Sequence, residues 1–203
     1  MNCTGKTRNL GLLLNIDWRF SEHINNSIKR AFGKLKVIFN KKSLLDPMIK
    51  KSLCDSLVLS HFNFCDMLYR PCLWEPDVKR IQMIQNCCVR MIGNIRKYER
   101  GVSAKMKEIR WFNISERGVL HILILYNKII YQKCPNYLYQ KRKFRYDADA
   151  LDSRHKFTIT LPSHKTTLFK RSSSYQISFI CKKLPINLKY APPPNLEKKF
   201  ISF

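Results

Sequence analysis

Apolar residues recur at three- and four-residue steps in four separate stretches of the chain, a spacing that predicts helices with one buried face each. The first helix is predicted to begin at Ser21, a residue type that favours the capping position, with Glu22 in its first turn. Its buried face is expected to consist of Ile24, Ile28, Ala31, Leu35 and Ile38. Four cations of the same stretch lie mostly off this stripe: Lys29, Arg30, Lys34 and Lys36.

Two further helices follow from the same pattern. Asp46 and Pro47 are typical of a helix start, since proline fits the first turn. This helix is predicted to run on toward Phe64, with a buried face made of Ile49, Leu53 and Leu57. A later helix, which Ser115 is expected to cap, has a predicted buried face of Val119, Ile122, Leu123, Tyr126 and Ile130.

The stretch from Pro76 to Gly93 predicts another helix and contains two adjacent cysteines, Cys87 and Cys88. Neighbouring residues on a helix point about 100° apart, so these two thiols cannot both face one metal ion. Its predicted apolar face comprises Val78, Ile81, Ile84, Gln85, Cys88 and Ile92. The cysteine pair is therefore interpreted as packing within a helix, because free cysteine is commonly a small buried hydrophobe.

Each predicted helix has one polar side and needs neighbours, which predicts a mainly α protein with a helical bundle. Leu10 to Ile16 is predicted to be a buried strand, the remnant of a strand or hairpin at the N-terminus. Composition changes after Cys134–Pro135, where basic residues dominate and helical periodicity is poor. We predict three segments: 1–20 with the strand, 21–135 with the bundle, and an irregular basic region at 136–203, partly disordered or a small α+β unit.

The net charge points to a polyanionic partner. Lysine and arginine number 38 against 14 acidic residues, giving a formal charge of +24. Nucleic acid is the first partner to consider, and an anionic membrane surface is the second. The segments KRKFR and FKRSSSYQ mix cations with aromatic residues, which suits phosphates and stacked bases, although a disordered basic tail has the same composition. The predicted nucleic-acid-binding residues are Lys29, Arg30, Lys34, Lys36, Arg80, Arg90, Lys141, Arg142, Lys170 and Arg171.

Cysteine usage and apolar runs give the remaining expectations. The eight cysteines are scattered without a Cys-x-x-Cys pair, which favours reduced thiols and an intracellular protein, nuclear or cytoplasmic. A zinc site from His61, Cys65 and Cys72 is the alternative, but it lacks a second close ligand pair. No metal, cofactor, small-molecule substrate or membrane partner is expected. The start of the chain does not resemble a signal peptide, and the apolar run from Val119 to Ile130 is too short to span a bilayer.

From about Asn9 onward the chain contains, in this order, NLGLLLNIDWRFSEHI, SLVLSHFNFCDMLYR, RIQMIQNCCVRMIG, VSAKMKEIRWFNISERGVLH, CPNYLYQ, SRHKFTITLPSHKTTLFKRS and KKLP. In their order and spacing these sequence segments resemble the C-terminal part of the reverse transcriptase of a jockey-type non-LTR (LINE-like) retrotransposon. The resemblance implies a primer-grip hairpin in the first segment and a polymerase thumb in the helices that follow. It implies that the basic remainder is the region at the end of the element's second reading frame.

The resemblance also implies which activity to expect. Reverse transcriptases carry paired aspartates in a Tyr-x-Asp-Asp hairpin before the primer grip, because two magnesium ions need clustered carboxylates. The nearest sequence here, YDADALD at Tyr146 to Asp152, has separated aspartates and is interpreted as an acidic loop. We therefore expect a non-catalytic fragment that binds nucleic-acid backbones without sequence preference. Two alternatives stay open: an inert retroelement remnant, and a piece of a larger active reverse transcriptase.

Overall fold

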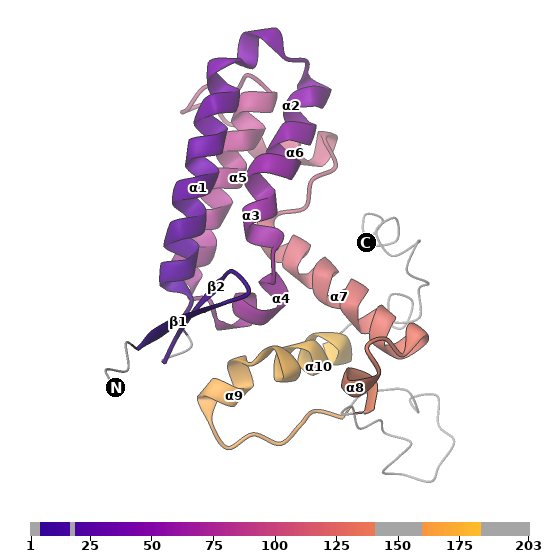
Figure 1. Ribbon diagram of the computed structural model, residues 1–203. Helices are drawn as coiled ribbons and strands as arrows, with labels where there is room; N and C mark the ends of the chain where they lie inside the picture. Colours follow the sequence, from indigo (N-terminus) through magenta and orange to yellow (C-terminus); the bar gives the residue numbers. More distant parts are fainter. Residues whose placement is uncertain (1–4, 17–18, 141–159, 184–203) are drawn as a thin grey trace. The chain divides into compact units, whose positions relative to one another are not determined.

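The structure is a computed structural model that describes residues 5–16, 19–140 and 160–183 (Figure 1). It is mainly helical with a short N-terminal hairpin, which confirms the predicted fold class. The chain forms two compact units, Met1–Gly118 and Val119–Phe203, and each is described by itself. The segment limits expected after residues 20 and 135 stay predictions.

The N-terminal hairpin pairs β1 (Lys6–Asn9) with β2 (Leu12–Asn15) in antiparallel register. Leu10 and Gly11 form its turn, with φ angles of 45° and 89°. The predicted strand from Leu10 to Ile16 was therefore too long, because the turn uses its first two residues. It was also not buried as a whole: only the first residue of β2 is buried, whereas Leu10 is 86% exposed and Ile16 is 76% exposed.

Helix α1 (Ser21–Asn40) follows the predicted pattern along its length. All five residues of the predicted apolar stripe are buried, and the four predicted cations are exposed. The predicted cap was wrong: Ser21 is the first helical residue, and its hydroxyl donates a hydrogen bond to Asp77 Oδ2 at 2.7 Å. The Ser21 hydroxyl thus donates to a carboxylate of α5 (Glu75–Ile92) and does not cap α1.

The second helical segment begins after Asp46, at Pro47, as predicted, and runs to Asn63 in three pieces. After the short helix η1 (Lys42–Leu44) come α2 (Pro47–Leu53), the π-helical turn η2 (Cys54–Leu59) and α3 (Ser60–Asn63). The predicted face was wrong at Ile49 and Leu57, which are 48% and 42% exposed.

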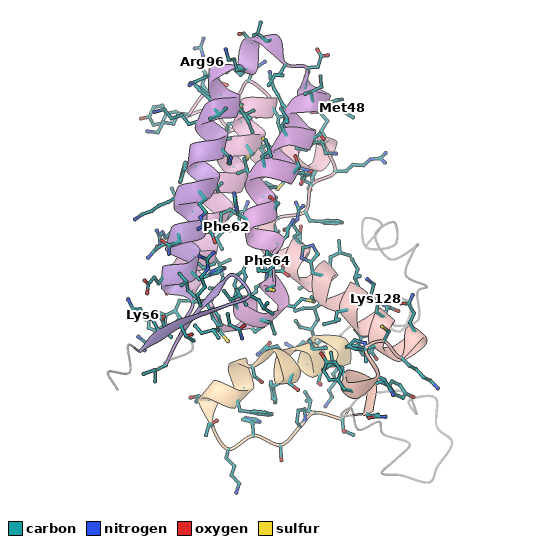
Figure 2. All side chains as sticks on the ribbon, in the orientation of Figure 1. Lys6, Met48, Phe62, Phe64, Arg96 and Lys128 are labelled. Atoms are coloured by element: carbon teal, nitrogen blue, oxygen red, sulfur yellow. The ribbon has the colours of Figure 1, made fainter. Side chains whose placement is uncertain are left out.

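The buried face lies one position further along the chain than predicted, and this offset is present before the π-helical turn, since Lys50 is buried where Ile49 was expected. The i→i+5 hydrogen bonds of the turn shift only the positions that follow it. The buried side chains are Cys54, Val58, Leu59 and Phe62 instead. Figure 2 shows Phe62 between α1 and α3, where it is fully buried.

Helix α5 (Glu75–Ile92) follows α4 (Asp66–Tyr69) and η3 (Arg70–Cys72) and is in contact with α1. It ends immediately before Gly93, as predicted. Its predicted apolar face is buried except for Val78, which is partly buried. Cys88 is buried and Cys87 is exposed, so the two thiols point in different directions, as their spacing requires.

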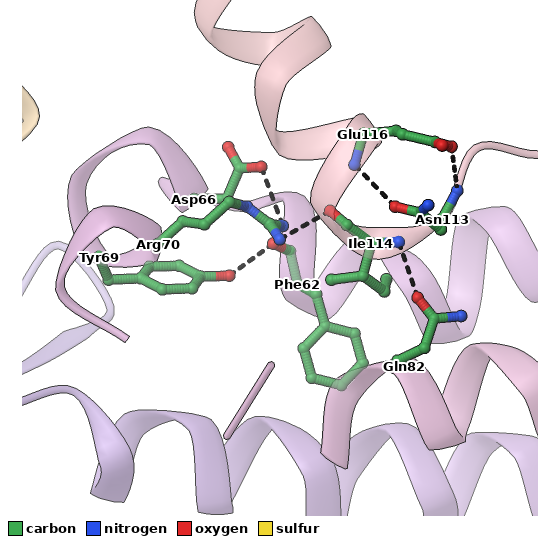
Figure 3. A network of polar contacts seen from close by, with 8 residues as sticks. All are labelled: Phe62, Asp66, Tyr69, Arg70, Gln82, Asn113, Ile114 and Glu116. Carbon is green, nitrogen blue, oxygen red and sulfur yellow. Dashed lines mark hydrogen bonds and ion pairs between the residues drawn. The ribbon is translucent and has the colours of Figure 1, made fainter. Parts of the chain in front are cut away.

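Helix α6 (Val102–Glu108) was not predicted, and α7 (Ile114–Gln132) begins two residues earlier than expected. The cap of α7 is Asn113 and not Ser115. The backbone N–H of Glu116 donates to Asn113 Oδ1 at 2.8 Å, and the N–H of Asn113 donates to Glu116 Oε2 at 2.9 Å. This reciprocal pair is a capping box (Figure 3). Within the predicted buried face, Ile122, Leu123 and Tyr126 are buried and Val119 is partly buried; the side chain of Ile130 lies outside what the structure describes.

A set of polar side chains ties the first turn of α7 to the bundle (Figure 3). Arg70 Nη1 donates to the carbonyl of Ile114 at 2.8 Å, and Arg70 Nη2 lies 3.3 Å from Asp66 Oδ2. Gln82 Oε1 accepts from the N–H of Ile114 at 2.9 Å. On the approach to the helix, Trp111 Nε1 donates to a carboxylate oxygen of Asp55 at 2.9 Å. Side chains from three different elements thus satisfy backbone and indole groups at this helix start.

The second unit contains the rest of α7 together with α8 (Asn136–Gln140), α9 (Thr167–Arg171) and α10 (Ser173–Lys183). Residues 160–166 have no regular structure, but residues 167–183 form helices that the sequence pattern did not predict. Thr166 caps α9 by accepting from the N–H of Phe169 at 3.2 Å. Tyr175 is buried, stacks on Phe179 and meets the ring of His164 edge-on.

Replacing Gly118 by alanine is expected to destabilise the protein, although alanine is the better helix former by about 1 kcal/mol. A Cβ at this position would overlap Cδ and Nε of Arg70, so the arginine would have to leave its bonds to Ile114 and Asp66. Hydrogen bonds of a charged donor contribute about 1.5–3 kcal/mol. We expect urea unfolding to show a net loss of about 1–2 kcal/mol.

Gly33→Ala is the matched control, since a Cβ at this helical position of α1 meets no atom within 4 Å. It should raise the free energy of unfolding by up to about 1 kcal/mol. If both alanine variants were stabilised equally, Arg70 would not be held in the position described.

Candidate nucleic-acid interface

The exposed side of α1 carries the largest group of predicted binding residues. Lys29, Arg30, Lys34 and Lys36 are all exposed, and none of them forms a hydrogen bond or an ion pair within the described residues. At 100° per residue they cover an arc of about 160° on the side away from the buried stripe. We call these four residues the α1 cation face. Its charges stay in water and are available to an external anion.

Acidic residues are rare around this face. Between residues 21 and 45 the sequence has six cations and one carboxylate, that of Glu22. Glu22 lies in the first turn of α1, where its Oε2 is 2.9 Å from Nζ of Lys6. The remaining turns of the helix therefore present positive charge alone, and the potential beside them favours phosphate.

Two histidines lie on the side of α1 that carries Arg30 and Lys34. Burial lowers the pKa of His23 and of His61 below the usual histidine value, and the charge of Arg30 lowers both further. Lys34 adds to the effect on His61. Both imidazoles are therefore mainly neutral at pH 7, and the charge on this side comes from the arginine and the lysine.

The two predicted arginines of α5 already bind groups of the protein. Arg80 Nη1 donates to Asn25 Oδ1 at 2.7 Å and lies 3.3 Å from Asp77 Oδ1. Arg90 Nη1 donates to the backbone carbonyls of Arg96 and Glu99, the latter at 3.1 Å. Arg80 is thus partly neutralised, and Arg90 holds the loop after α5.

The C-terminal predicted residues belong to the second unit or fall outside the described residues. Lys170 is exposed on α9, in the other unit, and Arg171 lies in the same helix with a side chain that is not described. Lys141 and Arg142 fall outside the described residues. Their part in binding stays a prediction.

A groove of about 520 Å³ runs between α1, the last turns of α5 and the loop that follows α5. Its apolar lining consists of Phe32, Leu35, Phe39, Cys87, Met91 and Ile95. Its cations are Lys36, Lys42, Arg90, Arg96 and Lys97. Figure 2 shows Arg96 beside the end of α1 that leads into η1. The groove therefore combines an apolar floor with a cationic rim, and it shares Lys36 with the α1 cation face.

The aromatic residues of this groove were not predicted from the sequence. Phe32 and Phe39 are 45% and 49% exposed, and they lie two helical turns apart on the same side of α1 as Lys36. Lys42 Nζ lies 4.1 Å from the centre of the Phe39 ring, a cation–π contact. A signal was present in the sequence, since both phenylalanines fall off the apolar stripe of a cationic helix.

The described residues contain neither a group of metal-ligating side chains nor a helix suited to cross a membrane. Over residues 5–16, 19–140 and 160–183, no three His, Cys, Asp or Glu side chains are close enough together to hold a metal ion. The alternative zinc site of His61, Cys65 and Cys72 is therefore not formed. Within the same ranges, no helix has both the length and the apolar character that crossing a membrane requires.

Comparison of the chain with protein-family models, with curated proteins and with solved structures finds no match in any of the three. The retrotransposon resemblance therefore rests on the sequence segments alone.

The adjacent cysteines differ in chemistry as well as in direction. Cys88 is buried beside Cys54, and their hydrogen bond together with burial raises the pKa of the Cys88 thiol. Cys87 lines the groove, and partial burial raises the pKa of its thiol as well. The packing interpretation is confirmed for Cys88, which is buried, whereas the side chain of Cys87 is exposed in the groove.

We expect N-ethylmaleimide to modify Cys87 in the folded protein and to leave Cys88 unmodified. The thiolate is the reactive form, so the rate at Cys87 should rise as the pH increases through and beyond about 8.5. Peptide mass spectrometry measures both sites, and unfolding in urea should expose Cys88. Equal modification of both cysteines without denaturant would contradict the burial of Cys88.

Proposed function

We propose that this chain binds the phosphate backbone of nucleic acids through the α1 cation face, without sequence preference and without catalysis. The proposal includes its origin as the thumb-like C-terminal part of a retrotransposon reverse transcriptase. The sequence segments support that origin, and the geometry of α1 supports the binding.

The observation that carries the proposal is the separation of the two sides of α1. Five apolar side chains bury one side in the bundle, and four cations without a protein partner among the described residues cover the other. Lys29 to Lys36 spans about 10 Å of helix axis. One strand of a duplex presents about three phosphates over that length. The face therefore fits a short stretch of backbone, and backbone contacts carry no base sequence.

Neutralising the α1 cation face should weaken binding and reduce its salt dependence. For the variant in which Lys29, Arg30, Lys34 and Lys36 are all replaced by glutamine, we expect the slope of log K against log salt on duplex DNA to flatten by about 2 to 3.5 units. Fluorescence anisotropy over a salt series measures this slope. Helicity by circular dichroism should be unchanged, because none of the four side chains is buried.

The matched control removes the same charge from exposed lysines elsewhere: Lys107, Lys128, Lys165 and Lys183. Its slope should change much less than that of the α1 variant. Equal slopes for the two variants would show diffuse attraction to a chain of charge +24 and would refute a dedicated face. Absence of binding by the unmodified chain would refute the function itself.

Primer extension tests the non-catalytic part of the proposal. With a primed RNA template, deoxynucleotides and magnesium, we expect no incorporation by this chain, because polymerisation requires clustered carboxylates that hold two metal ions. An active reverse transcriptase run in parallel shows that the template is usable. Extension that depends on this chain and persists after rigorous purification would overturn the claim.

A further inference from the structure

The groove between α1 and α5 has a chemistry that backbone binding alone does not use. A phosphate needs cations but gains nothing from the apolar floor formed by Leu35, Met91 and the exposed rings. An aliphatic ligand would gain nothing from five cations with no carboxylate among the lining residues. The lining is complementary to a ligand that is flat and apolar in one part and anionic in another. Its volume, about 520 Å³, lies in the range of small-molecule sites.

We propose that the groove takes an unpaired nucleobase of a single strand, with the base against Phe32 and its flanking phosphates on the cationic rim. The inference rests on the proposed function, which it extends from the backbone to single-stranded substrates. Aromatic side chains beside a positively charged track are the usual means of holding single strands, because every base has a face that can stack.

Phe32 is the ring best placed for stacking. It is 45% exposed and has no ring or cation partner among the described residues, whereas Lys42 already lies over the ring of Phe39. Lys36, one turn from Phe32, borders both the groove and the α1 cation face. A strand that follows the face thus reaches the groove without crossing an acidic residue of α1.

The loop after α5 supplies the polar groups on the other side of the groove. Asn94 is exposed, and its amide offers both a donor and an acceptor, so it can meet the edge of any base. Lys97 adds charge for a phosphate, whereas Nε of Arg96 lies 3.8 Å from Oε1 of Glu99. Arg90 holds the loop by donating to the carbonyl of Arg96. No element of this arrangement distinguishes one base from another.

A base inside a duplex is stacked and paired and cannot enter the groove. Single strands should therefore protect the groove, whereas duplexes should occupy only the α1 cation face. Cys87 reports on the groove because its exposed thiol belongs to the lining, and Cys134, which is exposed in the second unit, serves as a reference thiol.

The experiment measures the rate at which N-ethylmaleimide modifies each cysteine of the full chain, with and without an oligonucleotide at saturating concentration. The probes are oligothymidine, a duplex with the same number of phosphates, and an abasic strand of equal length. Oligothymidine should slow the modification of Cys87 by about fivefold or more and leave Cys134 unchanged. The abasic strand carries the same charge without rings and should protect much less.

Phe32→Leu provides the matching variant, since it keeps an apolar side chain and removes the ring. Its affinity for oligothymidine should fall by about fivefold or more, while its affinity for duplex stays the same. Phe64→Leu changes an equally exposed ring that is not part of the groove and should alter neither affinity.

The outcomes separate this inference from the proposed function. Salt-dependent binding of the duplex, with equal protection of Cys87 by abasic and normal strands, would overturn the base site and leave backbone binding intact. Protection by an acidic amphipathic peptide, but not by oligothymidine, would overturn it in favour of a protein partner. If no nucleic acid bound at all, both proposals would fall.

Discussion

The packing of one apolar stripe of α1 against η2 and α5 is the contact on which the first unit depends. Burial of a leucine or isoleucine side chain contributes about 1.5–3 kcal/mol, and α1 buries four of them together with Ala31. Rotation of the helix about its axis would expose this apolar stripe to water and bury lysine charges in the core, and both changes would destabilise the fold. The same packing that stabilises the bundle therefore determines which way the cations point.

Arg90 shows how one cation positions others. Its guanidinium donates to two backbone carbonyls of the loop after α5, and this loop carries the cations at the end of the groove. Carbonyl groups attract a guanidinium without neutralising it, so Arg90 holds the loop and keeps its own positive charge. An ion pair such as that of Arg80 with Asp77 orders a side chain at the cost of its charge. The two arginines of α5 thus have different electrostatic consequences, although the sequence presents them alike.

Periodicity predicted the helices well wherever a helix is regular. Every residue of the α1 stripe is buried, and most of the α5 face is too, because burial there follows the 3.6-residue repeat alone. The α2 face was wrong by one position, since Lys50, Cys54 and Val58 are buried where Ile49, Leu53 and Leu57 were expected. Ser21 does not cap α1, because its hydroxyl donates a hydrogen bond to Asp77, which lies 56 residues further along the chain. The Asn113-x-x-Glu116 capping box could have been predicted from its spacing, although Ser115 was chosen as the cap. The groove could not have been predicted, since it forms only when α1, α5 and the loop beyond α5 come together.

A π-helical turn holds one more residue between its ends than an α-helical turn does. Loss of a single residue within Cys54–Leu59 would return this segment to α geometry and leave the residues before and after it on the sides of the helix that they now occupy. Loss of a residue in the middle of α1 or α5 would rotate everything beyond it by about 100° and separate the apolar stripe from its partners. Length variation among chains that share this bundle should therefore concentrate at the π turn, where the register can absorb it.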